Sequence, residues 1–550
     1  MKNPTVRRVL LAVAAVLVVG GLYWFQLPPL NLRSPDFWSF LFEVMAVALV
    51  AVVLGRILTG KGTAPEVVMT NHGPRITVSK EGPKFFSGAV RVLVIGLGGV
   101  IAVGVIGSLI GAEIFHAGAY KDLIVKEEGN FTDDVAELTM DQIPVVDRDS
   151  ATKLGSRKLG EMSDLVSQFE IEPYYTQINY HGKPVRVTPL IYGDLFKWFA
   201  NSGNGVPAYL QVDMVTQETT LTRLDQGMKY APGEHLLRNL PRYLRFRYPT
   251  KVFGDPSFEI DEEGTPYWIT PTIQYRVGLW GGEDVEGAVL VNAVTGEHQY
   301  YAVADIPTWV DRVYSDAMVM QQLDWNGKYQ SGFWNAHFGQ RGVLRTTDGY
   351  NYIAVNDDVC LYTGMTSVTG DQSNVGFVLV NMRTKETKFY AVPGAEENSA
   401  MRSAEGQVQH LGYDATFPIL LNVADRPTYF MSLKDSAGLV KMFAFVDVER
   451  YQVVGTGNTV EEARANYIDI LQDEADVSTG ESETVTGVIS EIHSAVLDGN
   501  TRYYFRLEGA DTVYVAEIAI SSNLPFLKAG DTVSMTCSGE GDQVRVISFQ

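Results

Sequence analysis

The stretch Val289-Leu-Val-Asn-Ala-Val-Thr-Gly-Glu297 carries the pattern that decides the fold of this chain. A run of β-forming residues ends at Asn292, whose short side chain can accept hydrogen bonds from the backbone of a tight turn. Thr295, Gly296 and Glu297 supply a polar tip, and a second run containing two tyrosines follows. This order of residues predicts a β-hairpin.

Related hairpins occur at three other places, always with Asp or Asn at the position of Asn292. These residues are Asp213, Asn381 and Asp447. Each hairpin is preceded by a turn and an extended run. The runs begin at His181, Glu263, Asp348 and Asp425, which are 82, 85 and 77 residues apart. Self-similarity at such a period indicates repeated structural units.

Helical stretches accompany at least three of the units. They are predicted at residues 234–240, 306–322 and 459–471, where Thr459 and Glu462 form a capping box. Each unit is therefore expected to be a small sheet with one helix, which gives an α+β fold built from about four modules. The units are placed at residues 169–250, 251–340, 341–415 and 416–471, after a helical connector at 116–168.

The order of strand, Asn or Asp, Thr-Gly-Glu and strand resembles the PepSY-type modules of secreted and membrane-anchored bacterial proteins. The resemblance covers about 290 of the 550 residues and rests on this short turn motif. It implies a non-catalytic binding or inhibitory module of cystatin-like build that faces the cell wall or periplasm. The last unit departs from the pattern, because Glu449 and Arg450 stand in place of the Thr-Gly-Glu tip.

The C-terminal region has a different pattern. An acidic linker is predicted at residues 472–483, and residues 484–550 contain five short alternating strands. This count resembles a small OB-like β-barrel. A barrel of that kind needs basic and aromatic residues on one face to bind nucleic acid, and the acidic balance of the chain argues against this use.

Three apolar stretches in the first 115 residues, at 9–32, 37–58 and 92–112, are long enough to cross a bilayer. Lysine and arginine residues precede the first stretch and surround the loop at 59–90. The positive-inside rule therefore places the N-terminus and this loop in the cytoplasm, and residues 116–550 on the outer side of the cell membrane. A signal peptide is the alternative for the first stretch, but no A-x-A cleavage site follows it.

Three residues in these stretches are candidates for a role inside the membrane. Glu43 is an ionisable residue within the second stretch, which makes it a candidate functional residue. The alternative is that its carboxyl group is protonated or reaches the membrane interface. Gly107 and Gly111 form a GxxxG pair that could pack the three helices together or join two copies of the chain into a homo-oligomer.

Charge is distributed unevenly along the chain. Residues 1–115 contain ten Lys and Arg against five Asp and Glu, whereas residues 116–550 contain 34 against 60. A surface with this much negative charge repels nucleic acid. DNA and RNA are therefore excluded as partners. The two cysteines, Cys360 and Cys537, lie in different predicted domains, which excludes a disulfide framework.

No catalytic signature is complete in the sequence. The eight histidines are scattered, so the HExxH pattern is absent, and no GxSxG occurs. Ser150-Ala-Thr-Lys153 matches the S-x-x-K motif of penicillin-recognising enzymes, but no KTG completes the set. We therefore predict no catalytic residue, metal site or cofactor. The alternative is a cell-wall hydrolase whose paired carboxylates meet only in the folded chain.

Trp334, His337 and Phe338, in the insert at 325–340, form the candidate interaction surface. Exposed aromatic side chains there would bind a peptide or carbohydrate, and the alternative is that they close the core between two units. The sequence thus predicts a non-catalytic, membrane-anchored scaffold or interaction protein of the bacterial cell envelope. Its expected partner is an envelope protein or a cell-wall glycan. The other hypotheses are a regulator or inhibitor of a cell-wall enzyme or protease, and the hydrolase.

Overall fold

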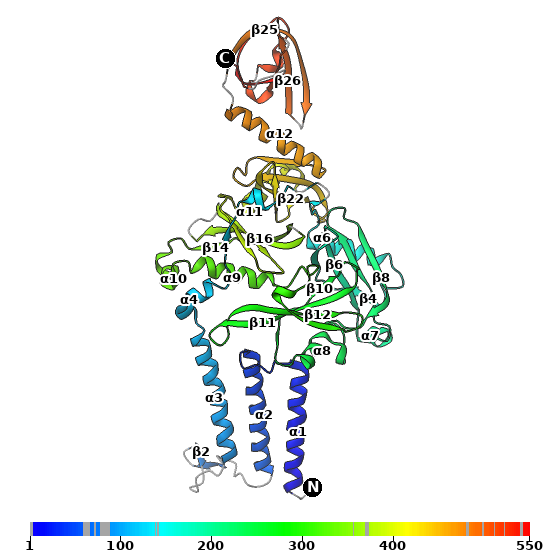
Figure 1. Cartoon of the computed structure of the whole chain (residues 1–550), viewed down its shortest axis with the longest axis vertical. Coiled ribbons are helices and arrows are strands. Elements are labelled where there is room, and N and C mark those ends of the chain that lie inside the picture. The colour runs from blue at the N-terminus through cyan, green and yellow to red at the C-terminus, as the bar shows by residue number, and fades with distance from the viewer. Residues whose placement is uncertain are drawn as a thin grey trace.

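The computed structural model describes residues 4–58, 66–70, 73–77, 88–137, 139, 142–355, 357–368, 373–479, 483–497, 500–510, 512–521, 523–538 and 543–549. Figure 1 shows three levels along the long axis of the molecule. Three helices stand at one end, a broad body of sheets and helices follows, and a small β domain lies at the other end. The fold is therefore mixed α+β with helices at the N-terminus.

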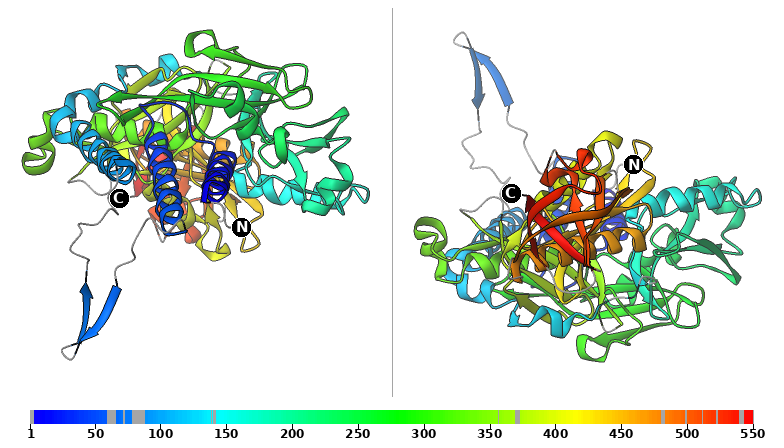
Figure 2. Two further views of the ribbon diagram at one scale, coloured as in Figure 1. Left: turned by 90° about the horizontal axis from the view of Figure 1, so that it is seen from below. Right: turned by 90° about the horizontal axis from the view of Figure 1, so that it is seen from above.

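The three N-terminal helices are α1 (Pro4–Gln26), α2 (Pro35–Leu58) and α3 (Gly88–Ile110). Each is long and apolar enough to cross a membrane, and at most 6% of the residues in each span are buried inside the protein. Apolar surface on this scale requires lipid around it. Seen from below, the helices stand in a row with α2 in the middle (Figure 2). The chain is thus membrane-embedded, and which side the body faces stays a prediction.

The loop between α2 and α3 contains a hairpin of β1 (Glu66–Thr70) and β2 (Gly73–Thr77). The rest of the loop predicted to be cytoplasmic, apart from the first residues of α3, lies outside the described residues.

The body contains four separate antiparallel sheets, here called sheets 1 to 4. Sheet 1 consists of β4 (Phe169–Ile171), β5 (Thr176–Tyr180), β6 (Lys183–Tyr192), β7 (Val206–Asp213) and β8 (Thr219–Met228). Sheet 2 consists of β9 (Val252–Phe253), β10 (Ser257–Ile260), β11 (Pro266–Val277), β12 (Gly281–Asn292) and β13 (His298–Ala302).

Sheet 3 consists of β14 (Leu344–Thr346), β15 (Asn351–Val355), β16 (Asp358–Ser367), β17 (Ser373–Asn381) and β18 (Thr387–Tyr390), with β19 (Gly394–Ala395) at one edge. Sheet 4 consists of β20 (Asp414–Ala415), β21 (Ile419–Val423), β22 (Arg426–Lys434), β23 (Val440–Asp447) and β24 (Val454–Gly457).

All four sheets follow one strand order. Two short strands pair with opposite halves of a long strand, which pairs with a second long strand and then with a final strand that is short in sheets 2 to 4. In sheet 2, for example, β10 pairs with residues 266–269 of β11 and β9 with residues 272–273. One helix precedes each sheet in the chain. These helices are α6 (Arg148–Gly160), α8 (Leu240–Arg247), α9 (Asp316–Lys328) and α11 (Glu397–Gln407).

The hairpins predicted from the sequence occur at all four places. The Asn292 side-chain oxygen accepts backbone hydrogen bonds from Val294 and Thr295 at 3.0 and 2.9 Å, and the Thr295 hydroxyl accepts one from Glu297 at 3.2 Å. Asp213 and Asn381 cap their turns in the same way. In sheet 4, Asp447 accepts from the backbone of Arg450 instead, as expected for a tip without the Thr-Gly-Glu sequence.

Two predicted helices begin later in the structure. The helix predicted at 306–322 is α9, which starts only at Asp316 because Ser315 caps it and Pro307 interrupts the earlier stretch. The helix predicted at 234–240 is α8, and the Asn239 side chain caps it through the backbone of Arg242. Helix α11, with only small and polar residues over much of its length, was not predicted.

The connector after α3 contains less helix than predicted, and its strand adds to sheet 3. It forms the short helices α4 (Glu113–Lys121) and α5 (Phe131–Asp134), and between them β3 (Glu127–Glu128) pairs in parallel with β18. Phe131 packs edge-on against Phe377 and Tyr390 in the core shared by sheets 3 and 4.

The segment predicted as an acidic linker instead continues a helix, α12 (Val460–Thr479), since Glu, Gln, Ala and Leu favour helix. It leads to the strands β25 (Glu483–Leu497), β26 (Asn500–Leu507), β27 (Val513–Glu517), β28 (Thr532–Ser538) and β29 (Gln543–Phe549). These strands pair in the closed order β25-β26-β27-β29-β28, with β27 and β29 parallel.

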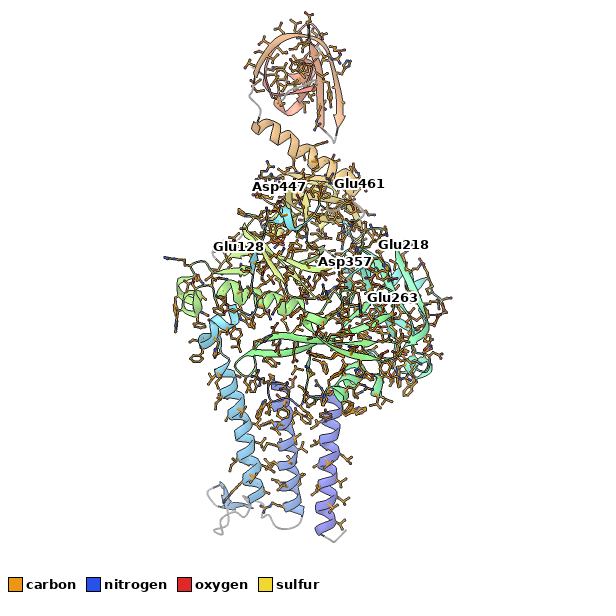
Figure 3. All side chains as sticks on the ribbon, viewed as in Figure 1. Glu128, Glu218, Glu263, Asp357, Asp447 and Glu461 are labelled. Atoms are coloured by element: carbon orange, nitrogen blue, oxygen red, sulfur yellow. The ribbon has the colours of Figure 1, made fainter. Side chains whose placement is uncertain are left out.

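Neither cysteine forms a disulfide and both are buried, Cys360 in sheet 3 and Cys537 in the C-terminal domain. Burial raises the pKa of Cys360 to about 12, so its thiol is unreactive at neutral pH. The labelled acidic side chains are spread over the body rather than gathered at one place (Figure 3).

Candidate functional site

The membrane helix α1 ends against helix α8 of the body. The Arg242 guanidinium donates two hydrogen bonds to the carbonyl of Trp24, at 3.3 and 3.4 Å, and its centre lies 4.2 Å from the Trp24 ring centroid. Arg245 donates to the carbonyl of Leu27 at 2.7 Å. The last carbonyls of a helix lack partners within it, and cations stabilise this end. The body therefore caps α1 at the point where it leaves the apolar span.

The body end of α3 meets the turn between β11 and β12. A Cβ added to Gly107 would lie 3.0 Å from the side chains of Leu279 and Trp280, and one added to Gly278 would lie 2.6 Å from Gly111 Cα. The two glycines of the GxxxG pair thus allow close approach of the body hairpin in this chain. Self-association of the membrane helices stays a prediction.

Glu113, at the start of α4, joins the same membrane end to helix α9. Its carboxylate accepts hydrogen bonds from the Trp325 indole at 2.8 Å and from the Tyr329 hydroxyl, and it pairs with Lys328 at 3.5 Å. Although burial acts in the opposite direction, these hydrogen bonds and the lysine charge lower the pKa of Glu113. The carboxylate is therefore ionised and holds α4 against α9 at neutral pH.

The contacts at α1 and α3 all reach the segment between residues 240 and 330, which contains α8, sheet 2 and α9. Sequence reasoning missed this coupling. Two signals were available: four arginines between Arg238 and Arg247, and the Gly-Leu-Trp-Gly-Gly turn at 278–282 with an apolar tip. Neither signal identifies its partner, because the contacts are more than 150 residues away in the chain.

Glu43 pairs with α1 at the body end of the membrane helices. The Gln26 side-chain amide donates a 2.6 Å hydrogen bond to the Glu43 carboxylate. A polar pair between two apolar helices fixes their rotation relative to each other. This contact gives Glu43 a helix-packing role that sequence reasoning did not consider.

The predicted interaction surface lies on α10 (Gly332–Trp334) and the π-helical turn Asn335–Gly339. The rings of Trp334 and Phe338 stack at 5.8 Å, and the two side chains are 64% and 79% exposed. Their neighbours Phe333 and Ala336 instead pack with Tyr329 into a small core. His337 lies over Phe333, at 4.1 Å between ring centroids. The insert therefore closes a core with one set of residues and exposes an aromatic pair with another.

A cleft of about 800 Å³ lies between sheets 1 and 2. Its walls come from the start of β5, the strands of sheet 2 and the segment before α9, and Asp36 at the start of α2 also lines it. Aromatic side chains make up much of the lining. They are Tyr174, Tyr175, Phe253, Phe258, Trp268, Tyr275 and Tyr314. An aromatic-lined concavity of this size is typical of a ligand site.

Carboxylates outnumber cations in this cleft. Asp316 pairs with Arg312 at 3.3 Å and accepts a hydrogen bond from the Tyr350 hydroxyl. Although burial raises it, the pKa of Asp316 is lowered by these contacts. Burial raises the pKa of Glu172, which also lines the cleft. Two carboxyl groups in one cleft thus differ in proton affinity because their surroundings differ.

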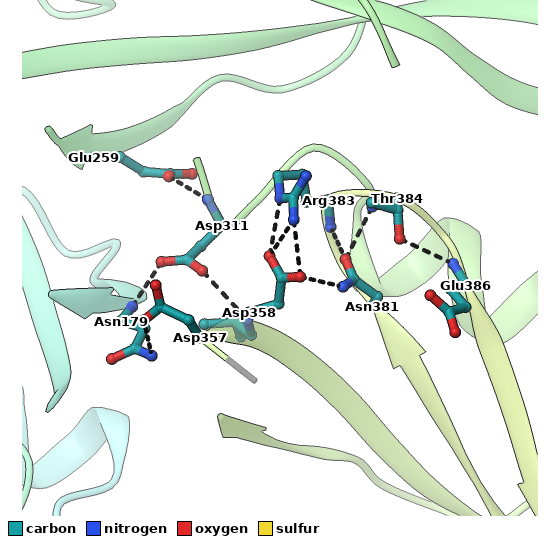
Figure 4. Close-up of polar contacts among 10 residues, drawn as sticks. Asn179, Glu259, Asp311, Asp357, Asp358, Asn381, Arg383, Thr384 and Glu386 are labelled. Carbon is teal, nitrogen blue, oxygen red and sulfur yellow. Dashed lines mark hydrogen bonds and ion pairs between the residues drawn. The ribbon is translucent and has the colours of Figure 1, made fainter. Parts of the chain in front are cut away.

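A buried acid pair joins sheets 1, 2 and 3 (Figure 4). Asp311 accepts backbone hydrogen bonds from Asn179 in β5 at 2.6 Å and from Val359 in β16 at 3.3 Å. Glu259 in β10 accepts from the backbone of Asp311 and Arg312, at 2.8 and 3.1 Å. Burial raises the pKa of Glu259 to about 7 and that of Asp311 well above its usual range. Both side chains are fully buried, so they act as a joint between sheets rather than as a site open to a ligand.

Lys153 of the S-x-x-K match and the acidic residues Asp358 and Asp284 have structural partners. Lys153 donates to the carbonyls of Ala437 and Gly438, at 2.8 and 3.3 Å, which ties α6 to sheet 4. Asp358 forms a two-pronged ion pair with Arg383, and Asp284 pairs with Lys385 at 2.5 Å. Within the described part of the chain, no group of three His, Cys, Asp or Glu side chains is arranged to hold a metal ion.

Comparison with known proteins gives weak structural matches only. No protein-family model matches the chain, and no curated protein sequence matches it. A sialidase from Trypanosoma rangeli in complex with 2,3-difluorosialic acid aligns at 8% identity and a TM-score of 0.16, over 69% of this chain and 53% of that one. An exo-1,5-α-L-arabinanase from a bovine ruminal metagenomic library aligns at 10% identity and a TM-score of 0.15, over 68% and 95%. The chain spans about half the length of the sialidase, and scores this low carry no argument about function.

Proposed function

We propose that this protein is a membrane-anchored scaffold of the bacterial cell envelope, which presents its body on the extracytoplasmic side and binds a partner there without catalysis. The observation that carries the proposal is the coupling of two membrane helices to one segment of the body. Arg242 caps α1, and the Gly278 turn and Glu113 hold the end of α3. A tether would need none of these contacts. A platform that keeps a fixed orientation above the bilayer needs all of them.

The four sheets act, in this proposal, as PepSY-like modules. Their common strand order, the helix before each sheet and the capped hairpin shared by the first three support this assignment. The five C-terminal strands form an OB-like barrel, which their closed pairing order supports. The body and helix α12 separate the barrel from the membrane helices, so the barrel reaches a partner at some distance from the bilayer (Figure 1).

The stacked pair of Trp334 and Phe338 is the proposed contact with the partner, either an envelope protein or a cell-wall glycan. Two large aromatic side chains held against each other and exposed to solvent lose little conformational entropy on binding. Their support by the Tyr329 and Phe333 core keeps them in place before binding.

Affinity capture from detergent-solubilised native membranes tests this function, with a tag after residue 550. The wild type is compared with the W334A/F338A double variant and with F526A, which removes an aromatic side chain that is 80% exposed in the C-terminal domain. The expected result is a protein or glycan retained by the wild type and by F526A but lost with the double variant. Equal retention by all three removes the aromatic pair from the proposal.

The captured partner also separates a scaffold from a regulator. If the retained protein is a cell-wall enzyme or protease, its activity is measured with increasing amounts of the purified full-length chain. A fall in activity that W334A/F338A fails to produce assigns the inhibitory role. Unchanged activity in the complex assigns the scaffold role.

A second candidate function is glycoside hydrolysis in the cleft between sheets 1 and 2. The observation that favours it is the opposite pKa shifts of Glu172 and Asp316, the pattern expected of a general acid and its ionised partner. Release of reducing sugars from purified peptidoglycan is the assay, with E172Q and D316N as the variants and D469N, at an exposed acid of α12, as the control. Activity that D469N retains and both cleft variants lose would establish it.

A further inference from the structure

A group of apolar side chains is exposed on the face of the body that meets the membrane helices. Its members are Leu195, Phe196 and Phe199 on α7 (Leu195–Asn201) and Leu236 and Leu237 in the single turn before α8. They are between 50% and 83% exposed. Figure 1 places α7 and α8 together at the lower edge of the body, beside the end of α1. We call these five residues the apolar face.

The two parts of the apolar face are held together from behind. Trp198 on α7 is buried and donates a 2.7 Å hydrogen bond from its indole to Glu234, and its ring packs edge-on against His235. Arg238 donates to the carbonyl of Ser202 at 2.7 Å. Because the polar contacts and the tryptophan point inward, the leucines and phenylalanines are left to point away from the body.

The backbone of Leu236 has an energetically unfavourable conformation. Leu236 has a φ of +54°, in the left-handed region that a leucine rarely adopts. Strain of this kind persists where the surrounding structure imposes it and is found at functional positions. Here it turns two adjacent leucines outward, with exposed fractions of 63% and 62%.

One arginine places the apolar face at the depth of the membrane surface. The Arg242 guanidinium donates to the carbonyl of Leu236 at 2.7 Å and to the carbonyl of Trp24 at 3.3 Å. Trp24 belongs to the apolar window Val9–Gln26 of α1. Leu236 therefore lies beside the last turn of a membrane-spanning helix, where the headgroups and the upper acyl chains of a bilayer are found.

The charge around the apolar face suits a lipid surface. Five basic residues and no acidic ones occur between residues 235 and 254, and Glu234 just before this segment is buried, whereas Asp194 precedes Leu195 and Asp255 follows the segment. Of the five basic side chains, that of Arg245 is buried and that of Arg247 is exposed. An exposed basic side chain near exposed leucine and phenylalanine is typical of protein surfaces that rest in the interface of an anionic bilayer.

We propose that the apolar face is a lipid-binding surface, which inserts into the headgroup and acyl boundary of the same bilayer that α1 crosses. The body then contacts the membrane directly as well as through its three helices. This contact adds a point of support on the α7 side, away from the row of helices (Figure 2). It goes beyond the scaffold function, because it assigns a ligand class, phospholipid, to a surface of the body itself.

The test uses the full-length chain in nanodiscs of phosphatidylcholine and phosphatidylglycerol, with an NBD fluorophore on single introduced cysteines. F196C and L237C report on the apolar face. F526C, in the C-terminal domain, is the exposed aqueous control, and V16C, a 70% exposed position on α1, is the membrane control. The native cysteines are buried and are left in place, with the unsubstituted chain as the labelling blank.

The expected result is that lipids with a shallow doxyl group quench the label at 196 and 237 and lipids with a deep doxyl group quench it at 16, near the middle of the α1 span, with a shift of emission to shorter wavelength at all three positions. The label at 526 should show neither change. Labels at 196 and 237 that behave like the one at 526 overturn the proposal, and so does quenching at only one of the two. An unquenched label at 16 would instead refute the membrane-spanning premise, which separates the two failures. Shielding of 196 and 237 from aqueous iodide without quenching by lipid would assign the face to a protein partner and also overturn the proposal.

Discussion

Replacing Gly278 by alanine should separate the β11–β12 turn from the end of α3. Gly278 has a φ of +59°, and a Cβ there would lie 2.6 Å from Gly111 Cα and 2.8 Å from Gly111 N. Both of these atoms belong to the backbone, so no side chain can rotate away. The hairpin must move, and the contact of Leu279 and Trp280 with Gly107 is lost with it.

The magnitude follows from two contributions. Alanine in the left-handed region costs about 1 kcal/mol by itself. Forcing an extra carbon into a filled contact costs about 1–3 kcal/mol more. G412A isolates the second contribution, because Gly412 has a similar φ of +65° but nothing within 4 Å of an added Cβ. The two variants should therefore differ by about 1–3 kcal/mol, which is roughly a 5- to 150-fold change in the local opening equilibrium.

Hydrogen–deuterium exchange of the full-length chain in nanodiscs measures this equilibrium locally. Relative to the wild type, exchange of the turn amides at 277–281 in G278A should rise more than exchange of the amides around residue 412 in G412A, by that factor, while peptides from β22 and β23 keep the wild-type rate. G412A should leave the turn unchanged. If G278A and G412A give the same exchange at 277–281, the close contact with Gly111 does not hold the body to α3, and the coupling argument fails.

The buried acid pair predicts a pH effect, because burial raises the pKa of both Glu259 and Asp311 in the folded state and stability should fall as pH rises from about 4 to 7. Glu259, with a pKa of about 7, should contribute roughly 3 kcal/mol of the fall between about pH 4 and 7. Thermal unfolding of E259Q across this range should show a shallower slope, with Asp311 supplying the rest, and an unchanged slope would contradict the assignment. N292A removes two backbone hydrogen bonds from its turn and should lower the free energy of unfolding by about 1 kcal/mol, measured by urea titration; no change would argue against the cap. Y329F removes the hydroxyl that donates to Glu113 and should loosen α4 from α9 by about 1.5–3 kcal/mol, visible as faster proteolysis near residue 120 than in K328M. Equal cleavage of the two variants would mean that the hydroxyl holds the carboxylate no more strongly than the lysine does.

The elements with a local cause were predictable from the sequence. The membrane helices follow from uninterrupted apolar stretches, and each hairpin follows from one Asp or Asn whose side chain caps its own turn two residues on. The starts of α8 and α9 were missed because their capping residues, Asn239 and Ser315, lie inside stretches that also fit an earlier start. Helix α11 was missed because it has no apolar stripe of its own and packs through Ala400 and Ala404.

The site depends on contacts that the sequence does not encode locally. The cleft takes Asp36 from the start of α2 and Asp316 from the start of α9, about half the chain apart, and no spacing rule joins them. Arg242 and Trp24 are 218 residues apart. The aromatic pair was found because both residues lie in one insert, but only the folded chain shows that Phe333 turns inward while Trp334 turns outward.

The connector after α3 has a consequence for how the protein is made. Its partners are far along the chain: Lys385 donates to the carbonyl of Leu123, Asn422 to that of Val135 and Ser432 to that of Val145, over separations of 262, 287 and 287 residues. At ribosomal rates of about 5–20 residues per second, this segment waits roughly 15–60 s for its partners to be synthesised. Sheets 1 and 2 can form while it waits. The apolar residues of the connector, including Phe131, lack their final partners during that interval, so biogenesis of this protein should depend on a chaperone that holds the segment until the second half of the chain has been made.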